Sequence, residues 1–232
     1  MSRKGAENVV AIDGPAASGK STVALQVAGR LGMRLVDSGS MYRAVTLLAV
    51  ERGVPLEDEG LLMDLAREVR RELSIDLISP GDLRVSLGER DVTGDIRSAL
   101  VGEAVSPVSR HPGVREEMVA FQREIVADQW SVVEGRDIGT TVFPHASLKV
   151  FLDATARERA ERRYLELKDK GIEVTHTRVD GEIRMRDAID SSRECSPLVA
   201  AEDAMLIDTN DLTIEQVVDE IIKECQARGI VT

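Results

Sequence analysis

The stretch of sequence that decides the fold is Asn8–Ser21, which reads NVVAIDGPAASGKS. Its first part, Asn8–Asp13, is apolar at successive positions, as in a strand that helices cover on both faces of a sheet. A loop containing glycine follows, and a helical pattern then runs from Gly19 to about Leu31. A strand, a tight loop and a helix in this order predict the first unit of an α/β domain.

The loop matches the pattern G-x4-G-K-S/T, which is known as a P-loop. Its glycines let the backbone turn so tightly that successive N–H groups and the helix N-terminus converge on a phosphate. We expect Lys20 to reach the β- and γ-phosphates of a nucleoside triphosphate, and the Ser21 hydroxyl to bind Mg²⁺. The predicted ATP-binding residues are Gly14, Pro15, Ala16, Ala17, Ser18, Gly19, Lys20, Ser21 and Thr22.

Short apolar segments alternate with helical patterns along the rest of the chain. A helix is expected over Met41–Val50, after a glycine loop at Ser38–Ser40. This alternation predicts an α/β fold of the P-loop NTPase kind, with helices on both faces of a parallel sheet. The further strands are expected at Leu35–Asp37, Val132–Val133, Leu148–Leu152 and Met205–Ile207.

One stretch departs from this alternation. Ser74–Ile78 and Leu83–Leu87 alternate apolar and polar residues, and turn-forming residues lie between them at Ser79–Asp82. We therefore predict a small antiparallel insert over Leu73–Val92. It is expected to continue into two helices, at Asp95–Ser109 and Gly113–Ala127.

Composition limits the classes of protein to which the chain can belong. Its 232 residues are 43% hydrophobic, which excludes an intrinsically disordered chain. No apolar run approaches the roughly 20 residues of a membrane span, and the polar N-terminus has no signal-peptide pattern. The net charge of −11 argues against a nucleic-acid partner. We expect a cytoplasmic, monomeric globular protein with neither a nucleic-acid nor a membrane partner.

A P-loop occurs in kinases, hydrolases, GTP switches and motors, and a second anion site facing it would favour a kinase. Ser38 and Arg43 follow the strand Leu35–Asp37 and are candidates for that site, although Ser38 also suits a helix N-cap. Arg136 and Asp137 follow the strand Val132–Val133 between two glycines. Ligands of open α/β sheets bind beyond such carboxyl ends, although a tight turn with a local ion pair explains this segment too.

A third candidate segment contains Arg186, Asp190 and Arg193. Their i, i+4, i+7 spacing places them on one face of a helix, where two guanidinium groups can grip phosphate and the carboxylate can accept sugar hydroxyls. A solvated ladder of ion pairs is the alternative. Glu134, at the end of a strand, is a candidate for holding Mg²⁺ through water.

The helix that begins at the capping-box pattern of Thr155 has an arginine-rich first half. Arg159, Arg162 and Arg163 are predicted to share one face and to close on phosphates as part of a mobile lid, although a solvated face is the commoner explanation. Phosphoryl transfer between two anionic nucleotides needs cations on both sides and exclusion of water, which these segments supply. The predicted catalytic residues are Lys20, Arg136, Arg159 and Arg163.

Four segments in the same order resemble the bacterial cytidylate kinase family: Gly14–Thr22, Asp37–Arg43, Gly135–Thr140 and Arg186–Leu198. The resemblance implies ATP as donor, Mg²⁺ as cofactor and CMP or dCMP as acceptor. It also implies a core similar to adenylate kinase over residues 1–72, 131–156 and 195–232. The remaining parts would be a nucleoside-monophosphate-binding insert over 73–130 and a lid with its adjoining helix over 157–194.

The resemblance also assigns the acceptor contacts. Phosphate would be held by Ser38, Arg43, Arg136 and Arg193, the sugar by Arg186 and Asp190, and cytosine by Ser106, Arg115 and Asp137. The chain departs from the family at Ser40, where alanine is common, and at Ala17, where glycine is common. A kinase for another monophosphate and a nucleotide-sensing module that transfers nothing are the alternatives to the implied activity.

Overall fold

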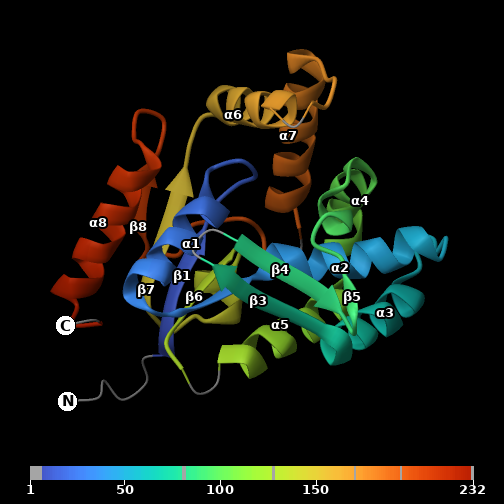
Figure 1. Ribbon diagram of the computed structural model, residues 1–232, viewed down its shortest axis with the longest axis horizontal. Helices are drawn as coiled ribbons and strands as arrows, with labels where there is room; N and C mark the ends of the chain where they lie inside the picture. The colour runs from blue at the N-terminus through green and yellow to red at the C-terminus, as the bar shows by residue number, and fades with distance from the viewer. Residues whose placement is uncertain (1–6, 80–81, 127–128, 170, 194, 231–232) are drawn as a thin grey trace.

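The computed structural model describes residues 7–79, 82–126, 129–169, 171–193 and 195–230. Five parallel strands form the central sheet in the order β2-β6-β1-β7-β8, which confirms the α/β fold (Figure 1). Each strand is slightly longer than its sequence pattern. The strands are β1 (Glu7–Asp13), β2 (Arg34–Asp37), β6 (Ser131–Gly135), β7 (Ala146–Asp153) and β8 (Met205–Asp208).

Helices cover both faces of this sheet, and the helix pair α6 and α7 lies beyond the carboxyl end of β7 (Figure 1). None of the described helices is long and apolar enough to cross a membrane. The helices are α1 (Lys20–Leu31), α2 (Ser38–Glu51), α3 (Glu59–Glu72), α4 (Ala99–Ser109), α5 (Pro112–Val126), α6 (Ala156–Asp169), α7 (His176–Ser191) and α8 (Ile214–Ala227).

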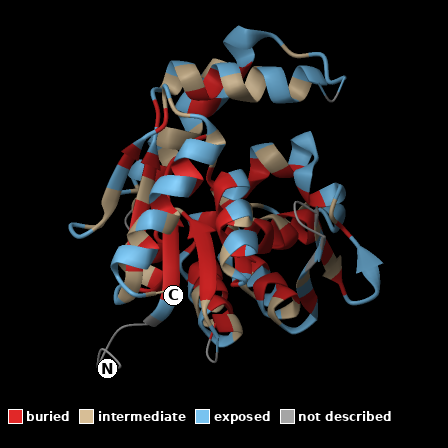
Figure 2. Ribbon diagram, turned by 60° about the vertical axis from the view of Figure 1, so that its left-hand side comes forward, coloured by how far each residue is buried: buried red, intermediate tan, exposed pale blue. Residues whose placement is uncertain are grey.

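The alternating side chains of β1 divide the interior into two cores. Val9 and Ala11 belong to a cluster that includes side chains of α2, α3 and α5, whereas Val10 and Ile12 belong to one that includes α1 and α8. All four side chains are fully buried, and the middle parts of the central strands are buried in Figure 2. A strand buried on both faces must be apolar at successive positions, as Asn8–Asp13 predicted.

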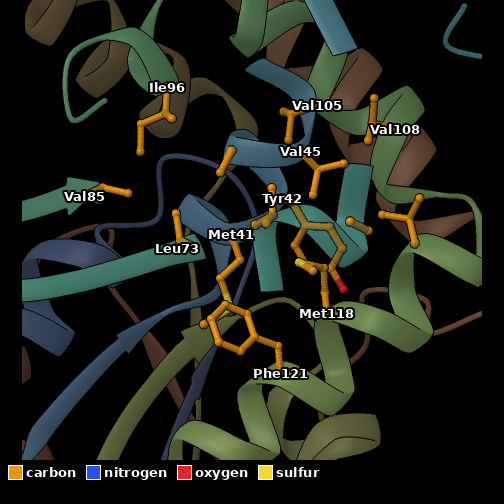
Figure 3. Close-up of a cluster of buried hydrophobic side chains, with 14 of the residues drawn as sticks. Met41, Tyr42, Val45, Leu73, Val85, Ile96, Val105, Val108, Met118 and Phe121 are labelled. Carbon is orange, nitrogen blue, oxygen red and sulfur yellow. The ribbon is translucent and has the colours of Figure 1, made fainter. Parts of the chain in front are cut away.

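The antiparallel insert is confirmed and has a third, two-residue strand that the sequence did not reveal. Its strands are β3 (Leu73–Ser79), β4 (Asp82–Leu87) and β5 (Arg90–Asp91). Residues 80 and 81 of the predicted turn lie outside the described residues. Leu73, Val85 and Ile96 pack in one cluster with Met41 and Tyr42 of α2 (Figure 3). The insert therefore shares a hydrophobic core with the main sheet.

Several predicted element boundaries were wrong. The helix expected over Asp95–Ser109 is divided: a 3₁₀ turn at Asp95–Arg97 precedes α4. Residue 127, the expected end of the next helix, lies outside the described residues. Thr155 accepts from the Glu158 N–H at 3.3 Å, but its own N–H donates to Asn210, so only half of that capping box forms.

The start of α2 also differs from the prediction. The helix begins at Ser38 instead of after a loop, because the Asp37 side chain caps it by accepting the Ser40 N–H at 3.0 Å. At the other end of the site, α7 stops at Ser191, so Arg193 lies beyond the helix on which it was expected. Ser38 therefore lies in a helix and Arg193 outside one, the reverse of what the sequence predicted. Both residues still line the cavity described below.

Gly14, the first residue of the P-loop, is expected to tolerate no side chain. Its φ is +150°, and an added Cβ would lie 2.1 Å from the Leu152 carbonyl oxygen. Gly14→Ala should lower the free energy of unfolding by more than about 1 kcal/mol, because backbone must move. Gly29→Ala is the control: it lies within α1 with nothing within 4 Å, and should raise stability by about 0.5–1 kcal/mol. Urea unfolding measures both, and equal effects would contradict the expectation.

Candidate active site

A cavity of about 410 Å³ opens at the carboxyl ends of β1, β2 and β6, where the predicted segments meet. Five predicted residues, Gly14, Pro15, Ser18, Arg159 and Arg162, do not line it. The predicted residues that do are Ala16, Ala17, Gly19, Lys20, Ser21, Thr22, Ser38, Arg43, Ser106, Arg115, Glu134, Arg136, Asp137, Arg163, Arg186, Asp190 and Arg193.

The P-loop forms one end of this cavity. Its backbone turns through two left-handed residues, Ala17 at φ 59° and Gly19 at φ 89°. The alanine that departs from the family pattern therefore occupies a conformation that glycine adopts more readily. The Lys20 ammonium donates to the Pro15 carbonyl at 2.6 Å. Burial lowers the pKa of Lys20 to about 7, and the nearby charge of Arg136 lowers it as well.

Oxygen atoms suited to a magnesium ion lie beside the P-loop. The Ser21 hydroxyl donates to Glu134 Oε1 at 2.6 Å, and Glu134 is buried at the end of β6. Burial raises the pKa of Glu134 to about 7, and the charge of Asp37 raises it as well. Among the described residues no group of three or more His, Cys, Asp or Glu could hold a metal. Such a donor set fits an ion that also needs nucleotide oxygens and water as ligands.

The opposite end of the cavity collects guanidinium groups from distant segments. Asp190 of α7 accepts from Arg136 Nε at 3.1 Å and also pairs with Arg193. Arg193 donates in addition to Ser109 Oγ at 2.9 Å, and Arg43 donates to the Ile96 carbonyl of the insert at 3.2 Å. The structure thus brings together arginines that are 150 residues apart in sequence, counting from 43 to 193.

These positive charges exceed the carboxylates among them. Burial lowers the pKa of Arg186 to about 10, and the charges of Arg136 and Arg43 lower it as well. Burial likewise lowers the pKa of Arg193. The Nε atoms of Arg186 and Arg193 are buried without a hydrogen-bond partner in the part of the chain that the structure describes. Buried donors without acceptors are costly, so this end of the cavity favours an anionic ligand.

A buried ion pair lies beside these arginines. Arg115 of α5 pairs with Asp137, and both side chains are almost fully buried. The guanidinium lies 5.4 Å from the centre of the Tyr42 ring. The carboxylate of Asp137, the guanidinium of Arg115 and the ring of Tyr42 together suit a planar ligand that has hydrogen-bonding groups at its edge.

The three arginines predicted to share one face of α6 point to different partners. Arg159 is buried and donates to both oxygens of Asp187 and, at 3.1 Å, to the Ala16 carbonyl. Arg162 donates to Thr209. Of the three, Arg163 alone lines the cavity. The prediction of one shared phosphate-facing surface was therefore wrong.

The sequence analysis missed several cavity-lining side chains, of which Tyr42, Asp37 and Arg97 are the most informative. Tyr42 has a buried hydroxyl with no hydrogen-bond partner among the described residues, Asp37 caps α2, and Arg97 comes from the insert. Tyr42 and Asp37 adjoin residues that were singled out, so the motif itself contained the signal. Arg97 has no such local signal, because it reaches the cavity only through the packing of the insert.

Acid is expected to stabilise the ligand-free protein through Glu134. Its pKa is about 7 when folded and 4.5 ordinarily, so the folded state binds the proton more tightly than the unfolded chain. Between these values the free energy of unfolding rises as the pH falls, and Glu134→Gln removes this contribution. Urea unfolding of both proteins across about pH 5 to 8, without nucleotide, measures the difference. Parallel curves would contradict it.

Comparison with known proteins agrees with this geometry. The family model described as cytidylate kinase matches residues 10–227. A cytidylate kinase of Caldanaerobacter subterraneus subsp. tengcongensis is 48% identical over 212 residues, which cover 91% of this chain and 92% of that protein. One from Geobacillus sp. is 49% identical over 214 residues, which cover 92% and 94%. The chain belongs to the cytidylate kinase family.

Proposed function

We propose that the protein transfers the γ-phosphoryl group of ATP to CMP or dCMP, giving ADP and CDP or dCDP. The observation that carries this proposal is the cavity with a P-loop at one end and half-buried arginines at the other. Among the described residues, the buried Nε atoms of Arg186 and Arg193 have no hydrogen-bond partner. Two anions can approach each other there because cations lie on both sides of the gap. Kinases of this name at almost half sequence identity support the choice of acceptor.

The donor is held by the P-loop, residues 14–22. An entering triphosphate adds negative charge beside buried Lys20, which raises the pKa of the lysine and so favours its protonated form. Lys20 then faces the charge that develops on the transferring group, together with Arg136 and Arg163. Arg159, the fourth residue predicted to be catalytic, would act by holding the P-loop carbonyl of Ala16.

Mg²⁺ accompanies ATP in this proposal. Ser21 and Glu134 would hold it, the latter through water. When bound, the ion supplies positive charge against the β- and γ-phosphate oxygens. In the ligand-free protein the Ser21 hydroxyl donates to Glu134, so the two oxygens already lie together.

The acceptor is held by the arginine end of the cavity. Its phosphate would bind Ser38, Arg43, Arg136 and Arg193, and its sugar would bind Arg186 and Asp190. Cytosine would bind Ser106, Arg115 and Asp137. A carboxylate such as Asp137 can accept from the amino group of cytosine, which uracil lacks.

The proposed parts of the chain have distinct tasks. Residues 1–72, 131–156 and 195–232 form the P-loop core, 73–130 the acceptor-binding insert, and 157–194 the lid with its adjoining helix. We also infer that the protein acts as a cytoplasmic monomer, away from nucleic acid and membranes, which its net charge of −11 favours.

Turnover with four acceptors tests the function directly. With ATP and Mg²⁺, kcat/KM should be highest for CMP or dCMP and lower for UMP and AMP, since only cytosine offers an amino group to Asp137 at the proposed position. A coupled assay of ADP release measures this. A preference for UMP or AMP would identify a different monophosphate kinase, and ATP binding without acceptor-dependent ADP release would identify a sensing module.

Arg193→Ala should impair the handling of CMP far more than that of ATP. The side chain is 6% exposed and pairs with Asp190 at the acceptor end. Loss of a charge-assisted contact costs about 1.5–3 kcal/mol, so kcat/KM for CMP should fall by about 10- to 150-fold. Titration calorimetry with each nucleotide separates the two effects.

The matched control is Arg228→Ala, which removes an arginine paired with Glu224 on α8. It should leave both nucleotides unaffected. Unchanged CMP affinity and rate in Arg193→Ala would remove this residue from the acceptor site.

A further inference from the structure

Behind the cavity wall lies a buried carboxylate that has no part in the contacts proposed above. Asp13 ends β1, directly before the P-loop, and is 5% exposed. Its Oδ1 accepts the backbone N–H of Ile138 at 2.8 Å, and its Oδ2 accepts that of Gly139 at 2.7 Å. One side chain thus joins the beginning of the donor loop to the turn that follows β6.

The turn needs this carboxylate because its first amides have no acceptor of their own. The Asp137 carbonyl accepts from Thr141 at 2.8 Å and from Val142 at 3.1 Å, as in the first turn of a helix. The amides of Ile138 and Gly139 point the opposite way, and at such an end N–H groups favour a negative charge. Burial raises the pKa of Asp13 to about 6, and these two hydrogen bonds oppose the rise.

The contact also fixes the distance between turn and strand. A Cβ at Gly139 would lie 3.4 Å from Asp13 Oδ2 and 3.1 Å from Lys149 Cδ. Lys149 belongs to β7, which pairs with β1 on the side opposite β6. The backbone at Gly139 is therefore held between Asp13 and a side chain of the next strand.

Two cavity-lining residues directly precede this contact in the chain. Arg136 pairs with Asp190, and Asp137 pairs with Arg115. Asp137 is also the residue whose carbonyl begins the turn, so any shift of Ile138 and Gly139 moves its backbone. Discrimination between bases depends on sub-ångström placement of such a carboxylate.

We propose that Asp13 is a positioning residue that sets the preference for cytosine over uracil by fixing Asp137. The inference rests on the proposed function, because it assigns the base contact to Asp137. A purely structural Asp13 would contribute stability and leave the choice of acceptor unchanged.

Asp13→Asn tests the proposal with little change in shape. The amide can accept from one backbone N–H but presents its NH₂ group to the other, so the turn loses one of its two anchors. The ratio of kcat/KM for CMP to that for UMP should fall at least about fivefold, mainly through KM for CMP.

Two comparison variants calibrate the result. Asp137→Asn removes the carboxylate itself and should give the largest loss of the CMP-to-UMP ratio. Ile221→Val trims a fully buried side chain of α8 and should lower stability without changing that ratio. An Asp13→Asn ratio equal to that of the wild type, at whatever stability, overturns the proposal.

Gly139→Ala keeps the test decisive if Asp13→Asn does not fold. Its Cβ would lie 3.1 Å from Lys149 Cδ and 3.4 Å from Asp13 Oδ2, so the added methyl group pushes the turn away from Lys149 and thereby strains the Asp13 contact. Its CMP-to-UMP ratio should also fall, and an unchanged ratio overturns the proposal. A wild-type protein without preference for CMP would instead refute the proposed function, so the two failures are distinguishable.

Discussion

Crowding of buried positive charge is the constraint on which the rest of this site depends. The charge of Arg136 disfavours the protonated forms of Lys20 and Arg186, and the charge of Arg186 disfavours that of Lys20. Asp190 pairs with Arg136 and Arg193 and so compensates only part of the excess. Such a cluster is costly for the folded chain until an anion enters. Under the proposed function, a bound phosphate would relieve this repulsion, which the fold of the ligand-free protein imposes.

Two features of the fold bring these charges together: the strand order of the sheet and the packing of the insert. Neighbouring parallel strands end at one edge of the sheet, which brings together the P-loop, Ser38 and the turn at Arg136. The insert reaches the same cavity by a different route, because its apolar side chains share a core with α2 (Figure 3). Arg115 and Ser106 are thus placed by hydrophobic packing. The insert over residues 73–130 shares this core with α2, so it is not an independent hydrophobic unit.

The sequence predicted what local chemistry determines. The spacing of glycines and lysine predicted the P-loop, and the apolar runs predicted the sheet. Most of the residues predicted for the site line one cavity. The sequence did not predict which side chains from distant segments pair with one another. Arg159 and Arg163 lie one helical turn apart, and no local sequence feature distinguishes them. In the structure Arg159 pairs with Asp187, whereas Arg163 lines the cavity. The backbone N–H groups of Ile138 and Gly139, which donate to Asp13, lie more than a hundred residues away in sequence. No periodic pattern in the sequence indicates this contact.

The capture of Arg159 has a consequence for motion. Its guanidinium bonds both oxygens of Asp187 and the Ala16 carbonyl, so it links α6, α7 and the P-loop at one point. If α6 shifts to bring Arg163 nearer a bound donor, either this partly buried ion pair breaks or α7 moves with it. Breaking it would leave a buried charge unpaired, which is the costlier course. Because α7 also carries Arg186, the cations proposed for the donor and for the acceptor would then move as one body. Closure would then act on both nucleotides at once, which aligns them and excludes water in the same step.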